Sequence, residues 1–173
     1  MSFNTLNYSL ENVKDQLAKQ AMVIDTLCQV SELQARWKPS PTEWSILEVI
    51  CHMYDEERED FRVRLANLLS NPDEEWPAIN PEGWVIERDY ASQNHVERLG
   101  QFLQERQTSI KWLTTLVEPK WGNKKVHPEL GAMTAEDMLF AWLTHDVRHI
   151  QQLGRLHYGY LKENCSDATR YAG

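Results

Sequence analysis

The sequence has no apolar run near the roughly 20 residues that a helix needs to span a bilayer. Its opening residues, MSFNTLNYSLENVKD, contain no basic segment followed by an apolar one, so we expect no signal peptide. The sequence also has no glycine-rich phosphate-binding loop, no internal repeat and no alternating run typical of a strand. These absences disfavour membrane proteins, nucleotide-binding α/β proteins and all-β folds.

Cysteine is scarce, with three residues at positions 28, 51 and 165. An odd number at wide spacing does not form a disulfide framework, which favours a reduced, cytoplasmic setting. Cys51 precedes His52 directly, but neighbours on a helix point about 100° apart. We therefore interpret Cys51 as a core residue and not as a metal ligand.

Basic residues are outnumbered, and the formal net charge is −8. An acidic chain repels phosphates unless a local basic patch intervenes, and the longest candidate is the short NKK at 123–125. We therefore expect no nucleic-acid partner. The 173 residues, with 42% apolar residues and seven tryptophans, suit one folded domain spanning 1–173.

Four long segments carry apolar residues at helical spacing, over about 9–33, 45–71, 92–117 and 134–161. Ser45 with Glu48 forms a capping-box pattern at the start of the second segment, and Thr134 with Asp137 resembles one at the start of the fourth. In the third segment, Arg106 interrupts an otherwise apolar seven-residue repeat. Such helices bury their apolar stripes only against each other, which predicts an all-α four-helix bundle.

Two connections, 71–89 and 118–133, are too long to be simple turns. Loops of this length in a compact domain are often functional or bind a partner. They carry three tryptophans, which could instead cover the ends of the core.

The histidines are the main chemical signal. His145 and His149 are four residues apart, so their rings lie about 40° apart around a helix and about 6 Å apart along it. Such a pair alone is more often structural than metal-binding. His52 borders the apolar stripe of the second segment and could face the pair across a bundle, or it could be an ordinary core histidine. Three neutral imidazoles with open positions would form a catalytic metal site.

Glu56 and Asp146 are the acidic residues nearest to these histidines, and we predict that they transfer protons or support an imidazole. The segment HDVRH differs from the HExxH motif of zinc proteases because an aspartate replaces the glutamate and no third ligand follows. His95 opens the third segment, where we expect it to be exposed. His127 is expected in loop packing before the fourth segment, and His157 in packing at the end of the bundle.

Two stretches together resemble the DinB-like proteins. The first is WKPSPTEWSILEVICHMYDEER, with its proline-containing turn, tryptophan–serine helix start and helix-borne histidine. The second is HPELGAMTAEDMLFAWLTHDVRHIQQLGRL, which contains H-D-x-R-H-x-x-Q. The resemblance covers nearly the whole chain in helix order.

The resemblance implies a DinB/YfiT-like bundle of up-down-down-up topology with long connecting loops. It also implies a metal site formed by His52, His145 and His149, holding zinc or nickel, with iron possible. Relatives in this family include thiol S-transferases, an isomerase and domains of ergothioneine-pathway enzymes, and many are homodimers. In the ergothioneine group a glutamate follows the last histidine by two positions, whereas this chain has Gln151.

From these patterns we expect a metal-dependent transferase or hydrolase that acts on a small molecule, possibly a low-molecular-weight thiol. Two alternatives stay open. The bundle could be non-catalytic, with metal or packed histidines that only stabilise it, or the acidic loop 71–89 could bind a protein partner.

Overall fold

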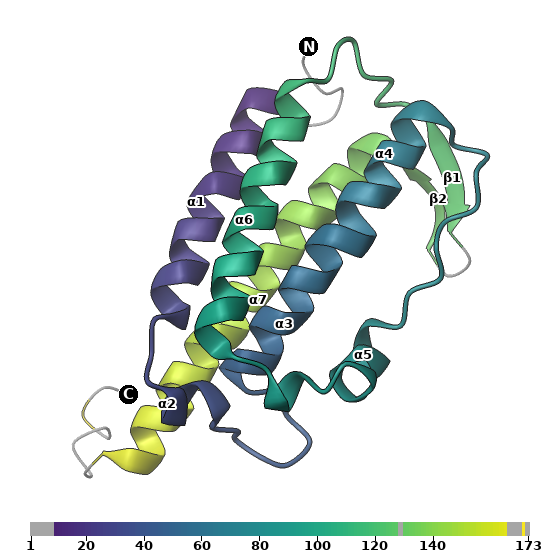
Figure 1. Ribbon diagram of the computed structural model, residues 1–173. Coiled ribbons are helices and arrows are strands. Elements are labelled where there is room, and N and C mark those ends of the chain that lie inside the picture. Colours follow the sequence, from purple (N-terminus) through teal and green to yellow (C-terminus); the bar gives the residue numbers. More distant parts are fainter. Residues whose placement is uncertain (1–8, 128–129, 166–170, 172–173) are drawn as a thin grey trace.

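The structure is a computed structural model, and it describes residues 9–127, 130–165 and 171. Four long helical stretches form a bundle: α1 (Leu10–Cys28), α3 continued by α4 (Ile46–Glu56 and Arg62–Ser70), α6 (His95–Thr114) and α7 (Ala135–Asn164). Figure 1 shows that α1 and α7 run in one direction, whereas α3–α4 and α6 run in the other. The predicted four-helix bundle and its up-down-down-up order are confirmed.

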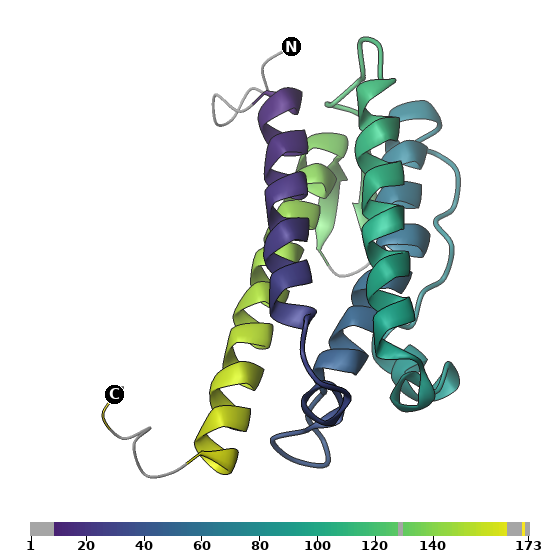
Figure 2. The same cartoon turned by 60° about the vertical axis from the view of Figure 1, so that its left-hand side comes forward.

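Helix packing brings segments from the two ends of the chain together. α1 packs against both α6 and α7, while α3 packs against α6 and α7 from the other side. Figure 2 shows that the last turns of α7 extend past the end of α1. As a result, α3 and α7, the helices that carry the three histidines of interest, face each other within the bundle.

Both histidine-bearing helices begin at the predicted caps. The Ser45 hydroxyl accepts a hydrogen bond from the Glu48 amide at 3.2 Å, and the Glu48 carboxylate accepts one from the Ser45 amide at 2.7 Å. Thr134 and Asp137 form the same reciprocal pair at the start of α7, at 2.9 and 3.1 Å. These bonds satisfy amide groups that a helix start leaves free, so each helix begins at a defined residue.

The second predicted helix contains an irregular turn. Between α3 and α4, residues Glu57–Phe61 form a π-helical turn, in which Glu57, Asp60 and Phe61 are buried. A π turn has one more residue per hydrogen-bonded loop than an α turn and therefore rotates the side chains that follow it. Three successive carboxylates at this junction, Asp55, Glu56 and Glu57, are all buried.

The connections contain more regular structure than the sequence indicates. α2 (Glu32–Arg36) is separate from α1, and α5 (Pro81–Glu87) lies inside the crossover from α4 to α6. The expectation that no strand is present was wrong, because β1 (Lys124–His127) and β2 (Gly131–Thr134) form an antiparallel hairpin. Each strand has only four residues, all of them exposed or half-buried, so neither strand adds an apolar run to the sequence. Pro128 and Glu129 between them lie outside the described residues.

The apolar core consists of two clusters with a charged layer between them. One cluster includes Phe102, and the other includes Trp142. The Arg106 guanidinium lies 5.2 Å from the Phe102 ring centre and 5.9 Å from that of Trp142. Cys51 belongs to the first cluster, as the sequence predicted. No helix in the described part of the chain is long and apolar enough to cross a bilayer.

Candidate metal centre

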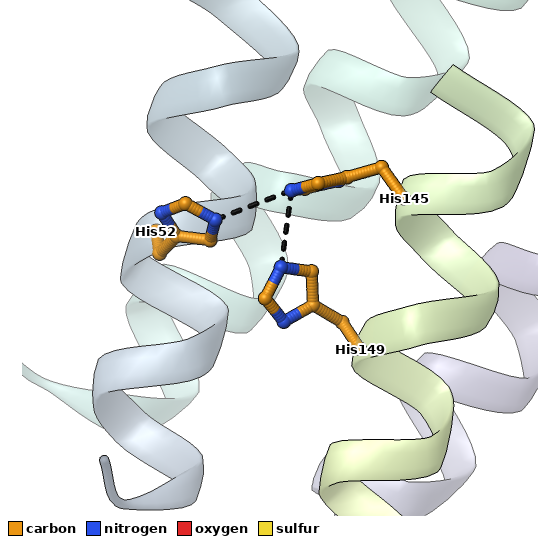
Figure 3. A group of neighbouring side chains, drawn as sticks. All are labelled: His52, His145 and His149. Atoms are coloured by element: carbon orange, nitrogen blue, oxygen red, sulfur yellow. Dashed lines mark hydrogen bonds between the residues drawn. The ribbon is translucent and has the colours of Figure 1, made fainter. Parts of the chain in front are cut away.

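Three histidines from two helices converge at one point. His52 comes from α3, and His145 and His149 come from successive turns of α7 (Figure 3). The Nε2 atom of His145 lies 3.2 Å from Nε2 of His52 and 3.0 Å from Nε2 of His149. All three candidate ligand atoms lie within 4.8 Å of one another. For comparison, two ligands of a tetrahedral ion with bonds of about 2.0–2.1 Å are about 3.3 Å apart.

Burial keeps these imidazoles uncharged. It lowers the pKa of His52 to about 3, against the opposing charge of Glu56. Burial likewise lowers the pKa of His145 to about 4, and of His149 to about 3. Because a metal ion binds only the unprotonated nitrogen, the three rings are in the form that can act as ligands at neutral pH.

Gln152 fixes which nitrogen of His149 carries the proton. Its Oε1 atom lies 2.8 Å from His149 Nδ1 and can only accept a hydrogen bond, so Nδ1 is the donor. The lone pair of Nε2 is then directed at the other two histidines. Partners that hold the far nitrogen of a ligand histidine in this way are usual at metal sites. The glutamine of the H-x-x-Q motif is therefore a residue whose role sequence reasoning missed.

Glu56 lies beside the histidines, one turn after His52 on α3. Its Oε2 atom is 2.9 Å from His145 Nε2 and 3.8 Å from His52 Nε2. Burial raises the pKa of Glu56, and electrostatic interactions with His52 and Arg64 oppose the shift. The structure thus places a buried carboxyl group with a raised proton affinity at the edge of the cluster.

The cluster opens onto the largest cleft described, with a volume of about 1030 Å³. Its lining includes all three histidines, Glu56 and Trp44, whose ring lies 4.9 Å from that of His52. His52 and His149 are only 5% and 6% exposed, so the nitrogen atoms are reached from one side only. A metal ion here would therefore have protein ligands on one side and an accessible position on the other.

Asp146, predicted to transfer protons or to support an imidazole, lies in a buried ion network and does not line the cleft at the histidines. Both of its carboxylate oxygens accept hydrogen bonds from the Arg106 guanidinium. Arg106 also donates two bonds to the Glu57 carboxylate, each at 2.9 Å, and Trp142 Nε1 donates to the same carboxylate at 2.8 Å. Asp146 is fully buried in this network. Through Arg106 it connects α7 to α6 and to the π turn, and so helps to hold the helix that carries His145 and His149 in place.

The remaining histidines lie outside the cluster. The prediction that His95 is exposed was wrong: it is 3% exposed, and its Nε2 atom lies 2.6 Å from the Cys28 carbonyl oxygen. His157 packs at the end of the bundle, where Nε2 lies 2.6 Å from the Leu27 carbonyl oxygen. His127 sits in the β-hairpin and lines the cleft. Arg148, directly before His149 and one turn after His145, also lines the cleft, and its charge contributes to the lowered pKa values of both histidines.

Comparison with models of known protein families shows which family the chain belongs to. The model of the DinB superfamily matches residues 16–153, which contain all three clustered histidines. The chain belongs to the DinB superfamily. No curated protein sequence matches the chain significantly.

A solved structure supports the same fold. This DinB-superfamily chain is similar to YfiT from Bacillus subtilis, described as a probable metal-dependent hydrolase with an unusual four-helix bundle topology. The two share 14% sequence identity and superpose with a TM-score of 0.75, covering 90% of this chain and 91% of YfiT. At this identity the likeness establishes the fold.

Proposed function

We propose that this protein is a metal-dependent hydrolase acting on a small molecule. The observation that carries the proposal is the convergence of three uncharged imidazoles at the bottom of a cleft of about 1030 Å³. Three histidine ligands with an open side are typical of catalytic sites, whereas structural sites enclose the ion with four protein ligands. The description of YfiT as a probable metal-dependent hydrolase agrees with this chemistry.

His52, His145 and His149 would hold the ion through their Nε2 atoms. A bound divalent ion supplies a Lewis acid, which lowers the pKa of water and polarises a substrate carbonyl or phosphoryl group. Glu56 accepts the proton of the attacking water, because its carboxyl is within hydrogen-bond distance of the cluster and burial raises its pKa. Gln152 keeps His149 in the ligand tautomer, and Asp146 holds α7 in place through Arg106.

The three imidazole nitrogens favour some metal ions over others. Neutral imidazoles suit zinc, nickel and iron, and zinc or nickel is our expectation. The metal content of protein purified without a histidine tag tests the site directly. We expect about one divalent ion per chain in the wild type and loss of most of it in His145→Ala.

His157→Ala is the matched control, because this histidine lies on the same helix and outside the cluster. The variant should keep its metal. Full metal occupancy in His145→Ala would contradict the proposed site.

Glu56→Gln separates catalysis from metal binding. The amide keeps the size of the side chain but cannot accept a proton. We expect a turnover number lower by about 10²–10⁴-fold on a panel of esters, amides and phosphoesters, with the metal content retained. Unchanged turnover with metal bound would remove Glu56 from the mechanism.

A thiol S-transferase is the second candidate. The cleft volume is at the upper end for small-molecule sites, which leaves room for a thiol beside an electrophilic substrate. Turnover of an electrophile that depends on added low-molecular-weight thiol would favour this activity over hydrolysis. A large gain in melting temperature with metal, but no turnover in either assay, would instead favour the non-catalytic bundle. Light scattering would test the expected homodimer.

A further inference from the structure

A second polar cleft lies on the other side of α3 from the histidine cluster. It has a volume of about 380 Å³, and none of its lining residues is shared with the cleft at the histidines. Its α3 residues include Cys51 and Asp55, which directly precede His52 and Glu56. Because consecutive helix residues point about 100° apart, the two clefts open on different faces of the same helix.

Hydrogen bonds and ion pairs join the residues at the floor of this second cleft. Asp55 is 4% exposed, and its Oδ2 atom accepts a 2.7 Å hydrogen bond from the hydroxyl of Tyr90, which is 2% exposed. The Arg88 guanidinium lies 2.7 Å from the same oxygen, and it also donates two hydrogen bonds to Glu59, at 3.1 and 2.8 Å. Arg88 therefore has its charge balanced by two carboxylates.

Positive charge exceeds negative charge in the second cleft. Its lining contains three arginines, at positions 58, 88 and 98, but only two carboxylates, Asp55 and Glu59. Arg58 shares these carboxylates with Arg88. Arg98 instead donates to the neutral amide oxygens of Gln101 and Gln93, at 2.8 and 2.9 Å. These bonds orient the Arg98 guanidinium and leave its charge without a carboxylate partner among the described residues.

An aromatic wall positions two of these arginines. The guanidinium carbons of Arg58 and Arg98 lie 4.9 and 5.2 Å from the ring centre of Tyr54. Contact with an aromatic face holds a planar guanidinium while its N–H groups stay available for a ligand. The excess of positive charge also contrasts with the net charge of −8 on the whole chain.

We propose that the cleft formed by Tyr54, Arg58, Arg88 and Arg98 binds a small anion that carries a phosphate group or one or two carboxylate groups. Arg98 is the principal ligand, since it is the arginine whose charge is not balanced. The volume lies at the lower end of the range for small-molecule sites, which suits a small organic acid or a small phosphate compound. The site is independent of the metal centre and of the proposed hydrolase activity.

Anion binding to EDTA-treated protein tests the proposal. Sodium phosphate and sodium malonate would be titrated at constant ionic strength against sodium chloride, with calorimetry and melting temperature as readouts. We expect one site per chain and, at ten times the dissociation constant, a melting temperature higher by about 3–6 °C. Comparing phosphate with malonate shows which acid group is preferred.

Arg98→Gln should weaken binding by about 10-fold or more, since it removes a charged donor. Arg98→Lys keeps the charge but not the planar fork and should retain part of the affinity, which guards against a folding defect in the first variant. Arg148→Gln, in the cleft at the histidines, is the matched control and should bind normally. Absence of binding, or binding lost in Arg148→Gln and kept in Arg98→Gln, would overturn the proposal.

Discussion

Replacing Arg106 tests how much the buried ion network contributes to the stability of the core. The residue is 1% exposed, and its side chain donates hydrogen bonds to Glu57, Asp146 and the Leu17 carbonyl oxygen. Replacing it with methionine leaves two buried carboxylates close together without a cation. Removing one partner of a buried ion pair costs about 3–5 kcal/mol, and we expect a loss of this size in the free energy of unfolding.

The exposed pair of Lys19 and Asp15 is the control. Their side chains are 2.7 Å apart and are 62% and 55% exposed, so Lys19→Met should cost less than about 1 kcal/mol. Unfolding in urea, followed by circular dichroism at pH 7 with EDTA present, measures both variants without any metal contribution.

Neutralising the carboxylates should restore stability to the Arg106→Met protein. Glu57→Gln and Asp146→Asn, added to that variant, remove the uncompensated charges and keep side chains of similar size. The triple variant should recover more than half of the loss, because unpaired charge and not lost packing is the main cost. A cost for Arg106→Met close to that of Lys19→Met, or a triple variant no more stable than Arg106→Met, would refute this reasoning.

Further predictions concern helix glycines and cysteines. In α7, Gly154→Ala should raise the free energy of unfolding by about 0.5–1 kcal/mol, because alanine favours a helix more than glycine does and the added Cβ would meet no neighbouring group within 4 Å. Gly159→Ala should lower it by about 1–3 kcal/mol, because its Cβ would lie 2.8 Å from the Trp37 ring; equal signs in urea unfolding would contradict this. Burial, with a smaller effect of Asp25, raises the pKa of Cys28 from 9.0 to about 12, so its stabilising contribution is complete below pH 9 and is lost as the pH rises toward 12. Between pH 9 and 11 the wild type should therefore lose roughly 1 kcal/mol per pH unit more than Cys28→Ala, and parallel curves would exclude the effect. A thiol reagent at pH 8 should label only the exposed Cys165 in native protein and all three cysteines after unfolding.

The sequence by itself determined the features that depend on neighbours within a few turns. Helical periodicity predicted the four long helices, and the short spacing of Ser45 to Glu48 and of Thr134 to Asp137 predicted where two of them begin. The spacing of His145 and His149 likewise placed both rings on one face of α7. These predictions held because each interaction lies within one helical turn or repeats along one helix face.

The tertiary structure alone decided the features that join distant segments. His52 meets His145 across 93 residues of chain, and Arg106 meets Glu57 across 49 and Asp146 across 40. The sequence marked Arg106 only as an interruption of an apolar repeat, and it did not indicate that Asp146 would accept hydrogen bonds from Arg106. A side chain's partners depend on which helices pack together and on how the π turn changes the direction of the side chains between α3 and α4. Those arrangements arise from the packing of the whole core, so no local stretch of sequence contains them.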